Sequence, residues 1–308
     1  MKGRRIENMQ SRTAEMTCGC RAVSWMEKRP AFKSGDWVAP LLLPRRIQVL
    51  FKIPPARRLL ARMMGPEGVY EWVIARTKII DQVFERALSG KTAQVLMVGA
   101  GFDTRAIRFK TDNRNLKVFE LDASATQKAK LGQYKARGIA VPRNVAFVPV
   151  NFEKEPISRK LLKKGFRKGA KTLVVAEGVF QYLKPEAAHA LFATLRDLVG
   201  PGSLLVFDYA HASALRGEGK AYGEERMTRE VKKVGESWQF GLDRRDVAPL
   251  LSKYSFRMIE LHSPSALEKR YFRSKDGKVT ARINGTQSIV LAEKVQRTRA
   301  KSTRRSRA

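Results

Sequence analysis

A short apolar run that ends in two closely spaced glycines constrains this chain more than any other feature of its sequence. Residues 95–98 have the composition of a buried strand, and Gly99-Ala100-Gly101 follows directly. Asp103 or Thr104 can then cap a new helix. Glycines let the backbone turn tightly and approach a ligand with no Cβ in the way. The segment therefore predicts a strand, a glycine turn and a helix whose first N–H groups point at a bound molecule.

Two classes of cofactor-binding enzyme use such a turn, and the residues that follow favour one of them. Dinucleotide-binding enzymes place a third Gly or Ala three residues after the second glycine, where this chain has Thr104. S-adenosylmethionine (SAM) has no pyrophosphate and requires only the close approach of the backbone. Either class uses an acidic residue about 20 residues further on to bind the ribose hydroxyls, and Glu120 and Asp122 stand there. A turn with a purely structural role is the alternative.

Length and composition limit the class of protein. A chain of 308 residues can form one large domain with additions, or two small ones. It has no apolar run of about 18 residues, so no membrane span is expected. Its first residues lack the apolar core of a secretory signal, and we expect a cytoplasmic protein. Cys18 and Cys20 are too close to frame a fold and too few for zinc, so we expect reduced thiols and no metal site.

The net charge of +32 is unusual. A field of this sign attracts nucleic acid, acidic membrane surfaces or small anions. The basic residues are scattered and are not interleaved with an aromatic platform for base stacking. We therefore favour solvated basic faces over a nucleic-acid site.

Composition divides the chain into segments. Residues 1–36 are polar and without pattern, so loose order is expected. Residues 37–90 form a helical cap, in which prolines cut residues 37–64 into short basic amphipathic helices. Such helices can lie on membranes, but we favour packing on the neighbouring domain with the charges outward. A cofactor-binding domain spans 91–295, with an insertion or lid at 210–238, and a disordered basic tail follows at 296–308.

Strands and helices alternate from residue 94 to 209, which indicates a parallel, doubly wound sheet. Two later strands bring the expected number to seven and include an antiparallel edge. The fold class is therefore α/β, with a Rossmann-like, mostly parallel seven-stranded sheet and an N-terminal helical cap. The predicted strands are 95–98, 116–121, 145–150, 172–176, 203–209, 256–262 and 285–295, and a helix is predicted at 242–251.

Several polar residues stand where ligands bind in such sheets, outside the carboxyl ends of the strands. Asn151 could accept a hydrogen bond from an adenine amino group and Phe152 could stack, although Asn151 also suits a simple turn. Glu177 ends an apolar strand, where a buried carboxylate requires a charged or donating partner. Arg76 lies in the helix that precedes the strand at 95–98. Its guanidinium could bind the SAM carboxylate through two parallel hydrogen bonds. His211 follows the fifth strand and is the candidate base among three histidines, with a bystander role as the alternative.

Four blocks occur in a characteristic order: Ala75-Arg76-Thr77 with Asp81, Val-Gly-Ala-Gly-Phe-Asp-Thr-Arg at 98–105, Phe-Glu-Leu-Asp at 119–122, and Ala-Glu-Gly-Val-Phe-Gln-Tyr-Leu at 176–183. On these blocks the chain resembles the leucine carboxyl methyltransferase-like group of class I SAM-dependent methyltransferases, whose bacterial members include O-methyltransferases of polyketide pathways. The resemblance covers about residues 70 to 295 and implies SAM as the cofactor.

The resemblance also implies a role for each candidate. Arg76, Gly99 and Gly101 would bind the methionine end of SAM, and Glu177 would lie beside its amino or sulfonium region. Asp122 would bind the ribose, with Glu120 as second choice. Asn151 and Phe152 would contact the adenine. The family pattern has aspartate where this chain has Asn151, which keeps an acceptor but loses a charge.

Methyl transfer from a sulfonium is an in-line displacement, so the protein chiefly aligns the reacting atoms. A carboxylate acceptor is ionised at neutral pH, whereas a phenol with a pKa near 10 benefits from a base. We expect O-methylation of a carboxylate or hydroxyl on a small anionic or phenolic molecule. The alternatives are a SAM-binding protein without turnover and a nucleic-acid methyltransferase. We rank the latter low because residues 176–180 lack the Asp/Asn-Pro-Pro-aromatic motif.

Overall fold

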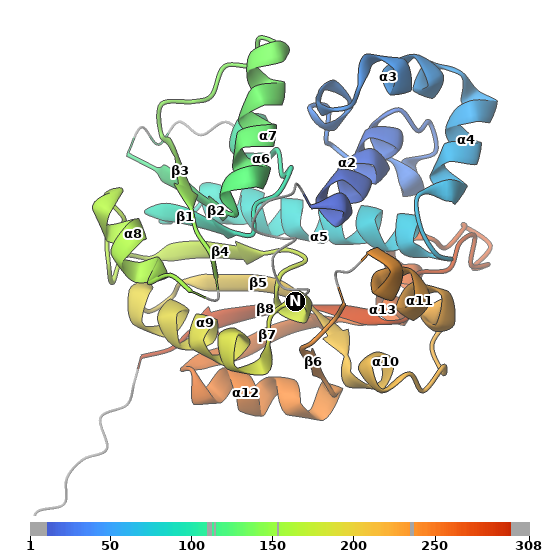
Figure 1. The fold of residues 1–308 in the computed structure, drawn as a ribbon. Helices are drawn as coiled ribbons and strands as arrows, with labels where there is room; N and C mark the ends of the chain where they lie inside the picture. The colour runs from blue at the N-terminus through green and yellow to red at the C-terminus, as the bar shows by residue number, and fades with distance from the viewer. Residues whose placement is uncertain (1–10, 110–112, 114, 153, 235–236, 297–308) are drawn as a thin grey trace, which may run out of the picture.

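The computed structural model describes residues 11–109, 113, 115–152, 154–234 and 237–296 (Figure 1). Eight strands in these ranges form one sheet in the order β3-β2-β1-β4-β5-β8-β7, and the short β6 pairs with β5. The strands are β1 (Gln94–Val98), β2 (Lys117–Asp122), β3 (Val145–Pro149), β4 (Thr172–Ala176), β5 (Leu204–His211), β6 (Gly241–Leu242), β7 (Phe256–His262) and β8 (Gln287–Lys294).

The direction of the strands confirms the doubly wound class. Strands β1 to β6 pair in parallel, and β8 runs antiparallel to both β5 and β7. The chain leaves β1 first toward β2 and then returns to its other side with β4, so the strand order reverses at β1. Ligands of open α/β sheets bind at such a switch point, outside the carboxyl ends of the strands.

Helices cover both faces of the sheet, each over its own apolar core. Strands β1 and β4 are buried along their whole length because both faces are covered. One face carries α2 (Arg12–Trp25), α5 (Val69–Leu88), α6 (Arg105–Arg108), α7 (Ser124–Ala136) and α13 (Pro264–Tyr271), and the other carries α8 (Ile157–Lys163), α9 (Pro185–Leu198) and α12 (Val247–Lys253).

Two predictions near the C-terminal half require correction. Gly241 and Leu242 pair with the end of β5 as β6, so the helix predicted at 242–251 begins later, as α12. The insertion at 210–238 starts inside β5 and contains α10 (Ala212–Arg216) and α11 (Glu224–Val234). The predicted tail lies, from residue 297 on, outside the described residues.

The prediction of loose order over residues 1–36 is wrong from residue 11 onward. Ser11 caps α2 by accepting a hydrogen bond from Ala14 N at 3.2 Å, and the helix packs into the core. Its buried face consists largely of small and polar residues, including Cys18, Cys20 and Arg21, so it gave no apolar periodicity. Burial raises the pKa of both cysteine thiols to about 12, which keeps them protonated.

Two short helices form the outer part of the predicted cap. Pro44 precedes α3 (Arg45–Lys52), and Pro54 and Pro55 begin α4 (Pro54–Met63), as the proline positions predict. Figure 1 shows α3 and α4 beyond α2, away from the sheet. Within the described ranges, every helix is too short or too polar to cross a bilayer.

Candidate active site

The glycine turn lies at the switch point, between β1 and α6. Gly99 and Gly101 have φ angles of +62° and +47°, in the left-handed region that other residues rarely adopt. A Cβ atom on Gly99 would lie 2.5 Å from Val179 Cγ2, which leaves no room for a side chain. Ala100 N donates to Leu121 O at 2.9 Å and ties the turn to β2. The turn thus depends on both glycines, as the sequence predicts.

The two acidic candidates on β2 have different surroundings. Asp122 accepts hydrogen bonds from Gly101 N and, at 2.6 Å, from Ala123 N. Burial raises the pKa of Asp122, and these two bonds oppose the rise. Glu120 is fully buried instead, with its Oε2 atom 2.7 Å from Lys130 Nζ. The structure therefore brings Asp122, and not Glu120, to the glycine turn.

Arg76, on α5, contacts the residue after β4 and a carboxylate within β5. Its Nη2 atom lies 3.1 Å from Glu177 Oε1, and its Nη1 atom lies 2.7 Å from Asp208 Oδ2. The second oxygen of Asp208 accepts from Gly178 N at 2.6 Å. Arg76 is only 5% exposed, and its Nε atom has no hydrogen-bond partner among the described residues. A buried guanidinium thus keeps one donor for a further acceptor.

Arg105 is the centre of the ion pairs around the turn. Its Nη1 atom lies 2.8 Å from Glu177 Oε2 and also pairs with Asp103, while its Nε atom lies 2.7 Å from Asp81 Oδ1. The side chain is 1% exposed. Burial acts to raise the pKa of Glu177, but Arg76 and Arg105 outweigh it and lower the pKa to about 2. Glu177 therefore remains ionised throughout the physiological pH range.

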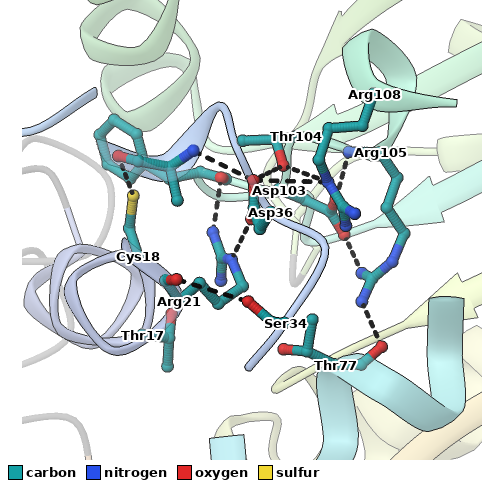
Figure 2. A network of polar contacts seen from close by, with 12 residues as sticks. Thr17, Cys18, Arg21, Ser34, Asp36, Thr77, Asp103, Thr104, Arg105 and Arg108 are labelled. Carbon is teal, nitrogen blue, oxygen red and sulfur yellow. Dashed lines mark hydrogen bonds and ion pairs between the residues drawn. The ribbon is translucent and has the colours of Figure 1, made fainter. Parts of the chain in front are cut away.

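A second part of this network, shown in Figure 2, connects α2 to the turn. Arg21 Nε lies 2.8 Å from Asp36 Oδ2, and Arg21 Nη2 donates to Phe102 O at 2.7 Å. Asp36 also accepts from Thr104 Oγ1 at 2.6 Å. Burial acts to raise the pKa of Asp36, but Arg21 and Arg108 lower it overall. These contacts fix the N-terminal helix across the glycine turn.

Sequence reasoning gave no role to several members of this network. Asp208 could have been found, because an acidic residue inside the apolar strand β5 is the same signal that singled out Glu177. Arg21 and Asp36 gave no signal, because each stands in a polar segment and its partner is distant in the chain.

Asn151 and Phe152 follow β3, which is the neighbour of β2 in the sheet. Asp122 is the last residue of β2, so the three residues stand at the same ends of two adjacent strands. Val150 N donates to Asp122 O at 2.9 Å, which holds the two strand ends together. Asn151 N donates to Glu155 Oε2 at 2.7 Å, and Phe152 is half-buried against the apolar core. The structure therefore brings both residues to the neighbourhood of Asp122.

His211 is not brought to this group of residues. Side chains alternate along a strand, so Asp208 faces Arg76 while Tyr209 and His211 face the other side of β5. His211 Nε2 lies 2.8 Å from Ser288 Oγ, and both side chains line a surface cavity of about 250 Å³. Burial lowers the pKa of His211. We therefore do not retain His211 as a base acting beside Arg76 and Glu177.

The comparison with known families agrees with this geometry. A family model described as leucine carboxyl methyltransferase matches residues 14–196, more than half of the chain. The chain belongs to the leucine carboxyl methyltransferase family. The expectation of a class I SAM-dependent methyltransferase is thereby confirmed.

Individual relatives of this methyltransferase carry consistent names. It is 29% identical over 225 residues to the Bacillus subtilis protein named "Putative S-adenosyl-L-methionine-dependent methyltransferase YktD", with 70% of this chain and 74% of that one covered. A similarly named Parafrankia protein is 30% identical over 241 residues, which cover 75% and 72% of the two chains. A crystal structure of a "putative methyltransferase" from Thermobifida fusca has a TM-score of 0.57 at 13% identity. The match covers 96% of this chain and 98% of that one, so the two proteins share the fold.

Proposed function

We propose that this methyltransferase transfers a methyl group from SAM to an oxygen atom of a small molecule, foremost a carboxylate and secondarily a hydroxyl. One observation carries the proposal: Glu177 pairs with both Arg76 and Arg105, and these two guanidinium groups lower its pKa to about 2. An efficient general base has a pKa near the working pH. Such a site suits an acceptor that is already ionised, as a carboxylate is.

Two features support SAM binding at the glycine turn. Gly99 and Gly101 are partly exposed and carry no side chain, so a ligand can approach their backbone closely. Arg76 Nε is a buried donor that has no partner among the described residues. When bound, SAM supplies a methyl group that its sulfonium has already activated. We assign the methionine carboxylate to Arg76, its ammonium to Glu177, its chain to Gly99 and Gly101, the ribose hydroxyls to Asp122, and the adenine to Asn151 and Phe152.

The remaining task of the protein is to align the acceptor and exclude water. Helix α2 lies against the turn, since a Cβ atom on Gly101 would come within 3.2 Å of Ala14 Cβ. The Arg21–Asp36 pair holds that helix in place. A covered site orients the acceptor oxygen and removes competing water, which are the main contributions a protein makes to a displacement of this kind.

Methyl-release assays with matched acceptors test the proposed acceptor class. Aromatic carboxylic acids are expected to be methylated with a kcat/KM that stays flat between about pH 6 and 9, because their carboxylates are ionised throughout. Phenols are expected to react with a kcat/KM that rises about tenfold per pH unit below their pKa near 10. The carboxamides of the same acids serve as controls and should not react. Transfer only to amines or to nucleic acid would contradict the proposal.

A further inference from the structure

The cap helices have a charge pattern that the proposed methyl transfer does not use. Between Trp37 and Pro66 the sequence contains six basic residues and no acidic residue. The basic residues are Arg45, Arg46, Lys52, Arg57, Arg58 and Arg62. Such a segment carries a local positive field on a chain that is already strongly basic.

The same segment concentrates the exposed apolar surface of the protein. Among the described residues, twelve large apolar side chains are exposed, and seven of them lie between residues 37 and 63. Helix α3 exposes Val49 by 60%, and α4 exposes Leu59 by 59% and Met63 by 70%. Ile53, between the two helices, is 50% exposed. Single exposed apolar residues need no explanation, but a group of this size on α3, α4 and the residues next to them indicates an interaction surface.

The two faces of the helices have separate roles. Phe51 is fully buried and Ile47 packs against the core, so the inward face of α3 already attaches the cap to the domain. On the outward face, Val49 lies between Arg45 and Ile53 at helical spacing, with all three exposed. The sequence led us to expect these helices to pack on the neighbouring domain with their charges outward, and apolar side chains share that outward face with the charges. The outward face interleaves cations with long apolar side chains.

We propose that the outward face of α3 and α4 docks on an anionic lipid bilayer. Apolar side chains such as Val49 and Met63 would enter the boundary between headgroups and acyl chains, and Arg45, Arg46 and Lys52 would meet the lipid phosphates. Charge complementarity selects this occupant, because the segment has no acidic residue to repel an anionic surface. Figure 1 shows both helices at the periphery of the molecule, where a flat surface can reach them.

Flotation of the full-length protein with lipid vesicles tests the proposal. We expect binding to vesicles that contain phosphatidylserine, weak binding to pure phosphatidylcholine, and a loss of binding as salt is raised. Each basic residue near an anionic surface contributes about 1 kcal/mol. The double variant Arg45→Gln/Arg46→Gln should therefore bind about 25-fold more weakly. The double variant Leu59→Ser/Met63→Ser should also lose affinity although its charge is unchanged.

Helix α8 provides the matched control, because exposed Leu162 is followed by exposed Lys163 and Lys164. The variant Lys163→Gln/Lys164→Gln removes the same charge elsewhere and should bind vesicles like the unmodified protein. Circular dichroism and S-adenosylhomocysteine binding confirm that each variant is folded. The proposal is overturned if anionic vesicles do not bind the protein, if pure phosphatidylcholine binds it equally well, or if the α8 variant loses as much affinity as the α3 variant.

Discussion

Replacing Arg105 with alanine is expected to destabilise the fold by about 3–5 kcal/mol, the cost of removing one partner from a buried ion pair. The side chain is 1% exposed and pairs with Asp81, Asp103 and Glu177, so its loss leaves three carboxylates without their central cation. The free energy of unfolding of a domain is typically about 5–15 kcal/mol. The variant should therefore lose a large share of its stability. Urea unfolding followed by circular dichroism measures the difference.

An exposed pair provides the control for Arg105. Arg196 lies 2.7 Å from Asp197 on the surface of α9, with side-chain exposures of 30% and 58%. Such pairs contribute about 0–1 kcal/mol because water and salt screen them. Arg196→Ala should therefore unfold close to the unmodified protein. Equal urea midpoints for the two variants would show that the network around Arg105 does not stabilise the fold.

The second large effect is expected for Arg76→Lys, which should weaken S-adenosylhomocysteine binding about 10- to 100-fold. Lysine keeps a positive charge near Asp208 and Glu177, but it lacks the planar fork and the Nε donor that arginine offers to a carboxylate. Hydrogen bonds to charged groups contribute about 1.5–3 kcal/mol. Isothermal titration calorimetry measures the affinity, and thermal unfolding shows whether the variant is folded.

Arg86 lies on the same helix and offers a matched substitution. It is exposed, and its Nη1 atom is 3.5 Å from Glu260 Oε1. Arg86→Lys should leave the affinity for S-adenosylhomocysteine unchanged. A folded Arg76→Lys protein with unchanged affinity would remove Arg76 from the proposed cofactor site.

The sheet was predictable because its signals are local. Residues 95–98 and 172–176 are continuous apolar runs of strand length, and each ends in a glycine-containing turn. Helix α2 was missed because its inward face carries cysteine, glycine and arginine, and its burial depends on the contact between Arg21 and Asp36. A tertiary pair of this kind leaves no periodic pattern in the sequence.

The sequence indicated which residues belong to the candidate site, but it did not indicate which of them form ion pairs with one another. The position of Glu177 at a strand end marked it as a buried carboxylate, but its arginine partners come from two other segments of the chain. His211 shows the opposite case. The predicted strand ended at Tyr209, whereas β5 continues to His211, and alternation from Asp208 then turns His211 to the other face.

The central claim is that one site at the glycine turn binds the cofactor through Asp122. Calorimetric titration of S-adenosylhomocysteine into the unmodified protein, Asp122→Ala and Asp197→Ala tests it most directly. A carboxylate that binds ribose hydroxyls contributes charged hydrogen bonds of about 1.5–3 kcal/mol each. We expect 1:1 binding to the unmodified protein and to Asp197→Ala, and an affinity at least about 100-fold lower for Asp122→Ala. Equal affinity in folded Asp122→Ala would contradict the account.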